Sequence, residues 1–124
     1  MDQPEIRTLI ESYLDAFAVR DLDRCVDSFR SDASLEWMMG VYGDRNSIEE
    51  WHKDRFEADL KILKVESIEV EDSTVTVDVV VNSKRLAAWR LPSLSGRVTV
   101  EFLDGKIHRL KFAAKSINPQ QDWS

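Results

Sequence analysis

The segment VTVEFLDGKIHRLKFAA, residues 98–114, has the pattern of a β-hairpin. Apolar and polar residues alternate up to Asp104-Gly105, a dipeptide typical of two-residue hairpin turns, and they alternate again after it. One face of the predicted pair of strands carries Val98, Val100, Phe102, His108, Leu110, Phe112 and Ala114. The other face is mostly charged, so we expect one face to be buried and one to face water.

The same alternation predicts strands earlier in the chain, over residues 74–81 and 33–39. Helices come before most of the strands. Apolar residues spaced by three and four predict helices over residues 4–17, 22–29 and 47–60, with residues 40–44 as a loop. Asp21 is the expected N-cap of the second helix, and Asn46 or Ser47 of the third.

This order predicts an α+β fold, with three N-terminal helices packed on a curved, mostly antiparallel sheet. Three or four strands cannot close a barrel, so we expect the sheet to curl around the first helix as a cone. An open cone with a packed base would form a pocket.

Composition narrows the classes of function. The 124 residues fit a single domain over residues 1–124, and we expect its polar end, 117–124, to be a loose tail. The net charge of −6 disfavours nucleic acid and anionic membrane surfaces as partners. A single cysteine and the absence of a signal-peptide pattern or long apolar run predict a cytoplasmic protein.

The order and spacing of several short motifs over residues 5–115 resemble the NTF2-like superfamily, in its SnoaL-like and ketosteroid-isomerase-like branches. The resemblance implies a conical α+β barrel, often a homodimer that packs through the outer face of its sheet. The motifs are Leu9-Ile10, Tyr13, Ala16-Phe17, Asp21-Leu22-Asp23, Phe29, Asp32-Ala33-Ser34, Gly40, Gly43 and Ile48-Glu49-Glu50-Trp51.

The ketosteroid-isomerase branch carries three catalytic groups, and the resemblance transfers one of them. Tyr13 matches a tyrosine that donates a hydrogen bond to the substrate oxyanion. Trp37 stands where the general-base aspartate is expected, and Val98 stands near the position of a protonated aspartic acid. Removing a proton beside a ketone needs a base, so steroid-isomerase chemistry is disfavoured.

Two histidines are alternative acid–base groups. His52 matches a helix aromatic that approaches the tyrosine in the isomerases, so a Tyr13–His52 hydrogen bond is expected. That bond would either orient a catalytic group or simply satisfy a buried pair. By alternation His108 should face the cone interior or its rim, although its place beside the hairpin turn also fits an exposed side chain.

Other residues are expected to line the mouth or the interior and to suit an apolar, ring-containing ligand. Alternatively, the indole rings fill the cone and leave no cavity. Arg55 could also pair with a substrate carboxylate. The expected lining residues are Phe17, Trp37, Trp51, Arg55, Phe56, Trp89, Val98, Leu110 and Phe112.

Three functions are therefore open. The first is a domain that binds an apolar small organic molecule without catalysis. The second is a cyclase, isomerase or hydrolase in which His108 or His52 acts as acid or base and Tyr13 donates a hydrogen bond. The third is a protein-interaction module that uses the outer sheet face. No glycine-rich phosphate loop and no metal-ligand spacing is present, so no cofactor or metal is expected.

Overall fold

A computed structural model describes residues 3–37, 40–88, 90 and 93–116 of the chain. Its helices are α1 (Gln3–Ala18), α2 (Leu22–Asp27), α3 (Arg45–Glu57) and the short α4 (Lys84–Ala88). Its strands are β1 (Phe29–Trp37), β2 (Gly40–Tyr42), β3 (Lys61–Glu71), β4 (Thr74–Asn82), β5 (Leu94–Leu103) and β6 (Lys106–Ser116). The predicted tail, 117–124, lies outside the described residues.

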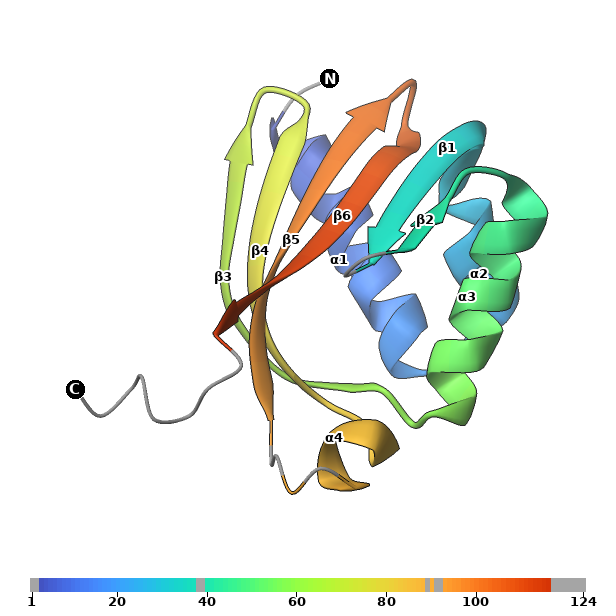
Figure 1. Cartoon of the computed structure of the whole chain (residues 1–124). Coiled ribbons are helices and arrows are strands. Elements are labelled where there is room, and N and C mark those ends of the chain that lie inside the picture. Colours follow the sequence, from blue (N-terminus) through green and yellow to red (C-terminus); the bar gives the residue numbers. More distant parts are fainter. Residues whose placement is uncertain (1–2, 38–39, 89, 91–92, 117–124) are drawn as a thin grey trace.

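The six strands form one curved sheet in the order β2-β1-β6-β5-β4-β3. β1 and β6 pair in parallel, and every other neighbouring pair is antiparallel. Figure 1 shows α1 against the concave side of the sheet, with α2 and α3 beside β1 and β2. The predicted α+β class, with three N-terminal helices on a curved and mostly antiparallel sheet, is confirmed.

The core lies between α1 and the concave face of the sheet. The four odd-numbered valines of β4, from Val75 to Val81, are buried, and the residues between them are less so. The apolar stripe of α1 is buried against this face, at Ile6, Ile10, Tyr13 and Phe17. The residues that the helical period of 3.6 and the strand period of two predict to be buried therefore pack together in one core.

The segment around Phe29 differs from the prediction. The sequence placed Phe29 on the apolar stripe of the second helix, whereas α2 ends at Asp27 and Phe29 begins β1. Ser28 ends the helix by donating its backbone N–H to carbonyls of the last turn. Phe29 is buried in either arrangement, so apolar spacing alone cannot distinguish a last helical turn from a first strand residue.

Other boundaries also shifted. Residues 40–42 form the short strand β2 rather than a loop, and α4 was not predicted. The N-cap of α3 is Asp44 instead of Asn46 or Ser47, because its carboxylate accepts from the Ser47 backbone N–H at 2.7 Å. Asp21 caps α2 as predicted, accepting from the Arg24 backbone N–H.

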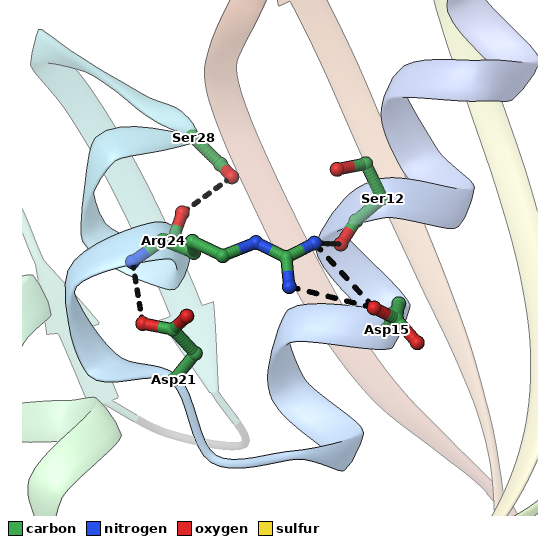
Figure 2. A network of polar contacts seen from close by, with 5 residues as sticks. All are labelled: Ser12, Asp15, Asp21, Arg24 and Ser28. Carbon is green, nitrogen blue, oxygen red and sulfur yellow. Dashed lines mark hydrogen bonds and ion pairs between the residues drawn. The ribbon is translucent and has the colours of Figure 1, made fainter.

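Arg24 joins α2 to α1 through polar contacts (Figure 2). Its guanidinium donates to the Ser12 carbonyl at 3.4 Å and pairs with the Asp15 carboxylate. Its backbone N–H donates to Asp21, and its carbonyl accepts from the Ser28 hydroxyl at 2.8 Å. The contacts with Ser12 and Asp15 link the two helices, and because they are exposed each adds little stability.

The ends of α1 and α3 are built alike. Arg20 and Asp59 each follow a helix in the left-handed backbone region, both with φ of 58°. In both turns the next residue donates its N–H to the carbonyl five residues earlier, at 2.9 Å, which is the Schellman arrangement. The Arg20 guanidinium then pairs with the Asp59 carboxylate and also donates to the Phe56 carbonyl, so the two helix ends are joined.

Within the described part of the chain, no helix is long and apolar enough to cross a membrane. A cytoplasmic location stays a prediction.

Candidate functional site

A cavity of about 50 Å³ lies between α1, α3 and the sheet. Seven of the predicted site residues line it: Tyr13, Phe17, Trp37, Trp51, Val98, Leu110 and Phe112. Other lining residues were not predicted: Ile10, Leu14, Leu60, Ile62, Val79 and Val81. The wall is apolar apart from the edges of Tyr13 and the indoles, and among the described residues no carboxyl group lines it.

The cavity volume shows how tightly the rings fill the cone. A drug-sized ligand usually occupies a pocket of roughly 300 Å³ or more, whereas a single water takes up about 30 Å³ of liquid volume. At about 50 Å³ the cavity is several times smaller than such a ligand pocket. In this conformation the aromatic side chains occupy most of the space that a ligand would take.

An aromatic stack forms one wall of the cavity. The rings of Trp37 and Phe112 stack with centroids 4.3 Å apart and an interplanar angle of 27°. Trp51 meets Trp37 edge-on at 5.3 Å. The Arg55 guanidinium carbon lies 5.6 Å from the Trp37 ring centroid, within range of a cation–π interaction. Trp37 is therefore held from three sides.

Gly96 makes this stack possible. A Cβ atom at Gly96 would lie 2.3 Å from the Phe112 ring, far inside contact distance. The two residues are on adjacent antiparallel strands, and the Phe112 ring crosses over β5 at the glycine. A glycine here leaves room that no other residue would leave.

Tyr13 and His52 form the predicted hydrogen bond, with 2.8 Å between the Tyr13 hydroxyl and His52 Nε2. His52 Nδ1 lies 2.8 Å from the Ile48 carbonyl oxygen. A carbonyl oxygen only accepts, so Nδ1 carries the proton and Nε2 accepts from the tyrosine. Both ring nitrogens of His52 and the hydroxyl proton of Tyr13 are thereby used.

Burial sets the ionisation of both residues. His52 is fully buried and in ring contact with Phe17, Phe29 and Trp51. Burial lowers the pKa of His52 from 6.5 to about 4, and the bond to the Ile48 carbonyl opposes this shift more weakly. Burial also raises the pKa of the Tyr13 phenol well above 10.0. At neutral pH both groups are uncharged.

His108 does not line the cavity. The register of β5 and β6 shifts between Glu101 and Phe102, whose partners are Arg109 and Ile107. His108 is the extra residue of this β-bulge, and Ile107 takes the buried position that alternation had given to the histidine. Of the two places expected for His108, the cone interior and its rim, the buried interior position therefore belongs to Ile107. The half-buried His108 lies near Asp32, where it adds to the effect of Arg30 in lowering the pKa of that carboxyl.

The remaining predicted residues lie at the margin of the site. Phe56 packs on Phe17 with ring centroids 5.2 Å apart, and Arg55 lies over the indoles, but neither borders the cavity. Trp89 lies outside the described residues. Among those that are described, no group of His, Cys, Asp and Glu is arranged to hold a metal ion.

One buried donor of the wall has no partner. The Trp51 indole N–H is shielded from solvent and finds no hydrogen-bond acceptor within the described ranges. Leaving such a group unsatisfied costs roughly 1–3 kcal/mol. An acceptor oxygen supplied by a water or a ligand would recover part of that cost.

No family model and no curated protein sequence matches the chain. Its fold matches solved structures at low sequence identity. SalBIII, an epoxide hydrolase/cyclase-like enzyme of pyran ring formation in the polyether salinomycin, aligns with a TM-score of 0.81 and 18% identity, over 91% of this chain and 92% of SalBIII.

Two further solved structures widen the range of functions found on this fold. A candidate ketosteroid isomerase from Kribbella flavida has a TM-score of 0.78 and 16% identity, over 93% of this chain and 81% of its own. An NTF2-like protein of unknown function from Cytophaga hutchinsonii has a TM-score of 0.72 and 13% identity, over 96% and 95%. With its three N-terminal helices and six-stranded curved sheet, the chain therefore has the NTF2-like fold.

Proposed function

We propose that the chain is a small-molecule-binding domain whose ligand is apolar and lies in the cone. The observation that carries the proposal is the cavity with its apolar, aromatic wall, which includes Trp51, whose buried N–H has no partner within the described ranges. Such a wall favours ring-containing or aliphatic ligands with an acceptor oxygen. At about 50 Å³, the cavity must enlarge on binding through side-chain rotation.

Binding can be tested by thermal shift with steroids, terpenoids, polyketide-like ketones and aromatic acids. A ligand at about 100 times its Kd adds ~2.7 kcal/mol, which for a domain of this size moves Tm by several degrees. The variant Trp37→Ala should abolish the shift measured from its own ligand-free Tm. Leu103→Ala is a matched control, because Leu103 is exposed beside the hairpin turn and away from the cavity. If Trp37→Ala keeps the full shift, the ligand does not bind in the cone.

An enzyme of the isomerase, cyclase or hydrolase type is the second candidate. It is favoured by the fold neighbours SalBIII and the Kribbella flavida protein, and by the position of Tyr13 in the cavity wall. Against it, the Tyr13 proton is donated to His52, so the phenol cannot also donate to a substrate oxyanion. Turnover of any thermal-shift ligand, lost in Tyr13→Phe but not in Tyr42→Phe, would support the enzyme over the binding domain.

We also propose that two copies pair through the outer sheet face. On this face Glu69 of β3 is aligned, through Thr76 and Thr99, with Lys111 of β6. A two-fold axis along the strands between β4 and β5 would place Glu69 of one copy over Lys111 of the other. Light scattering should then give a dimer mass that Lys111→Glu reduces and Lys111→Glu with Glu69→Lys restores. If the protein is a monomer at all practical concentrations, the proposed dimer is excluded.

A further inference from the structure

A second hollow adjoins the cavity described above. It has a volume of about 350 Å³ and lies between the end of α1 and the start of β3, and we refer to it as the rim recess. Phe17, Leu60 and Ile62 line both the recess and the cavity. These three side chains border both spaces, and we refer to them as the partition. If they rotate, the recess and the cavity become one site of the size that small-molecule ligands require.

The rim recess is lined by two cationic side chains, Arg20 and Lys61. Both pair with the Asp59 carboxylate, Arg20 directly and Lys61 at 3.4 Å from its Nζ. Two positive charges against one negative charge leave a surplus of one positive charge. This surplus stands out in a chain whose net charge is −6. A monoanion would balance it, whereas a phosphate dianion would exceed it.

Donor groups remain available on both cations. An Arg guanidinium has five N–H donors and a Lys ammonium has three. The described contacts of Arg20 use two of its nitrogens, toward Asp59 and the Phe56 carbonyl. Arg20 and Lys61 are both partly exposed, with 40% and 59% of their side-chain surfaces open to solvent. An incoming carboxylate can therefore reach them without displacing Asp59.

The apolar side of the recess continues into the cone. Leu60 and Phe17 are buried, Ile62 is half-buried, and Leu63 stays 53% exposed at the outer edge. Leu63 is the extra residue of a β-bulge, since the register of β3 against β4 skips it between Ile62 and Lys64. The chain thus presents apolar side chains from the solvent inward, with the two cations at the outer end.

We propose that the rim recess and the cavity form one site for a small amphipathic carboxylate. The anionic head lies between Arg20 and Lys61, and the apolar body passes Phe17, Leu60 and Ile62 into the aromatic wall. This inference rests on the proposed function and names the class of its ligand. In this proposal the partition side chains move aside when the ligand binds.

The test uses decanoate and decanol, two probes with the same aliphatic chain and different heads. Binding is followed by the fluorescence of the tryptophans in the wall. We expect decanoate to bind more tightly than decanol, and added salt to weaken only decanoate. Lys61→Glu should weaken decanoate by about tenfold or more and leave decanol unchanged.

Lys64→Glu is the matched control. Lys64 lies three residues further along β3, pairs with Val80 on the outer face, and does not line the recess. It changes the net charge by the same amount, and it should leave both probes bound as in the parent chain. Lys61→Gln, which adds no repulsion to Asp59, provides a milder second variant if Lys61→Glu folds poorly.

The outcomes separate the two proposals. Decanol binding as tightly as decanoate would overturn the anionic head site and leave the apolar binding domain standing. Equal losses in Lys61→Glu and Lys64→Glu would show a general charge effect and would also overturn the head site. If neither probe changes the fluorescence, the chain does not bind aliphatic ligands in the cone. That result contradicts the proposed carboxylate site and, for aliphatic ligands, the proposed binding function.

Discussion

The Tyr13 hydroxyl donates to Nε2 of His52, and this bond closes a chain of contacts from α1 to the backbone of α3 through the Ile48 carbonyl. All of its members are buried. A buried pair in which every polar group is satisfied stabilises one arrangement of the two helices. It also keeps the histidine neutral and the phenol protonated at neutral pH.

Removing the Tyr13 hydroxyl should reduce stability. Tyr13→Phe leaves His52 Nε2 as a buried acceptor with no donor, which costs roughly 1–3 kcal/mol in the free energy of unfolding. Urea denaturation of parent and variant measures this cost. Tyr42→Phe is the control, since Tyr42 is only half-buried on β2 and no described contact uses its hydroxyl. Equal losses in the two variants would contradict the role of the Tyr13–His52 bond.

Stability should rise with pH through the titration range of His52. Its pKa is about 4 in the folded chain and near 6.5 when unfolded, so between these values the unfolded state binds more protons. The free energy of unfolding should therefore be highest above pH 6.5 and fall as pH decreases toward 4, by about 3 kcal/mol in all.

Chemical denaturation at several pH values between 5 and 7 checks this slope, because most carboxyl groups titrate lower. His52→Gln should remove most of the slope, and His108→Gln should retain it, since His108 is half-buried in a bulge outside the core. If His108→Gln removes the slope and His52→Gln retains it, the pH dependence of stability comes from His108, and the prediction for His52 is contradicted.

Gly96→Ala should displace the Phe112 ring. Its Cβ would lie 2.3 Å from that ring, so Phe112 must move and its stack with Trp37 must open. Overpacking of this kind costs roughly 1–3 kcal/mol. Near-ultraviolet circular dichroism should report the change in the environment of Trp37, and urea denaturation the loss of stability.

A glycine control and a rescue make this prediction specific. Gly43→Ala should be nearly neutral, because its added Cβ would meet nothing within 4 Å. In the background of Phe112→Leu, the added cost of Gly96→Ala should shrink, since the obstructing ring is absent. A cost that stays the same would show that the backbone of β5, and not Phe112, requires the glycine.

Asp59→Ala should destabilise the chain more than Asp59→Gly. Both variants lose the ion pair with Arg20, which is open to solvent screening and contributes little to stability. Only alanine also keeps a side chain in the left-handed backbone region, at a cost of roughly 1 kcal/mol. Thermal denaturation of the two variants measures the difference. If alanine and glycine are equal, the left-handed turn is not retained in the variants.

Regular patterns made most of the fold predictable from the sequence. The hairpin turn at Asp104-Gly105 has positive φ at both residues, of 54° and 81°, as its composition indicated. The stripe of α1 and the alternation of β4 also correspond to their predicted burial. Each of these patterns depends only on neighbours within one element.

The errors arose where one residue breaks the period. The bulge at His108 interrupts the alternation of β6. Counting back by twos from Leu110 and Phe112 therefore predicted an inward direction for the histidine, whereas Ile107 takes the buried position. Ile62 was missed because the first half of β3 is mostly exposed and shows no clear alternation. The size of the cavity depends on how Trp37, Trp51 and Phe112 interlock, which no local pattern encodes.

The parallel pairing of β1 with β6 has a consequence for how the chain folds during synthesis. β6 follows the other five strands of this sheet in the chain, so it is synthesised after them, and it lies between β1 and β5 in the sheet. Before β6 is made, the β1–β2 pair has no hydrogen-bonded link to β3, β4 and β5. Ser34 of β1, for example, pairs with Arg109 of β6. Contacts between residues that are far apart in the sequence, such as Ser34 and Arg109, form slowly. The nascent helices and first strands therefore keep apolar surface exposed until β6 is made, a period in which chaperones have access to them.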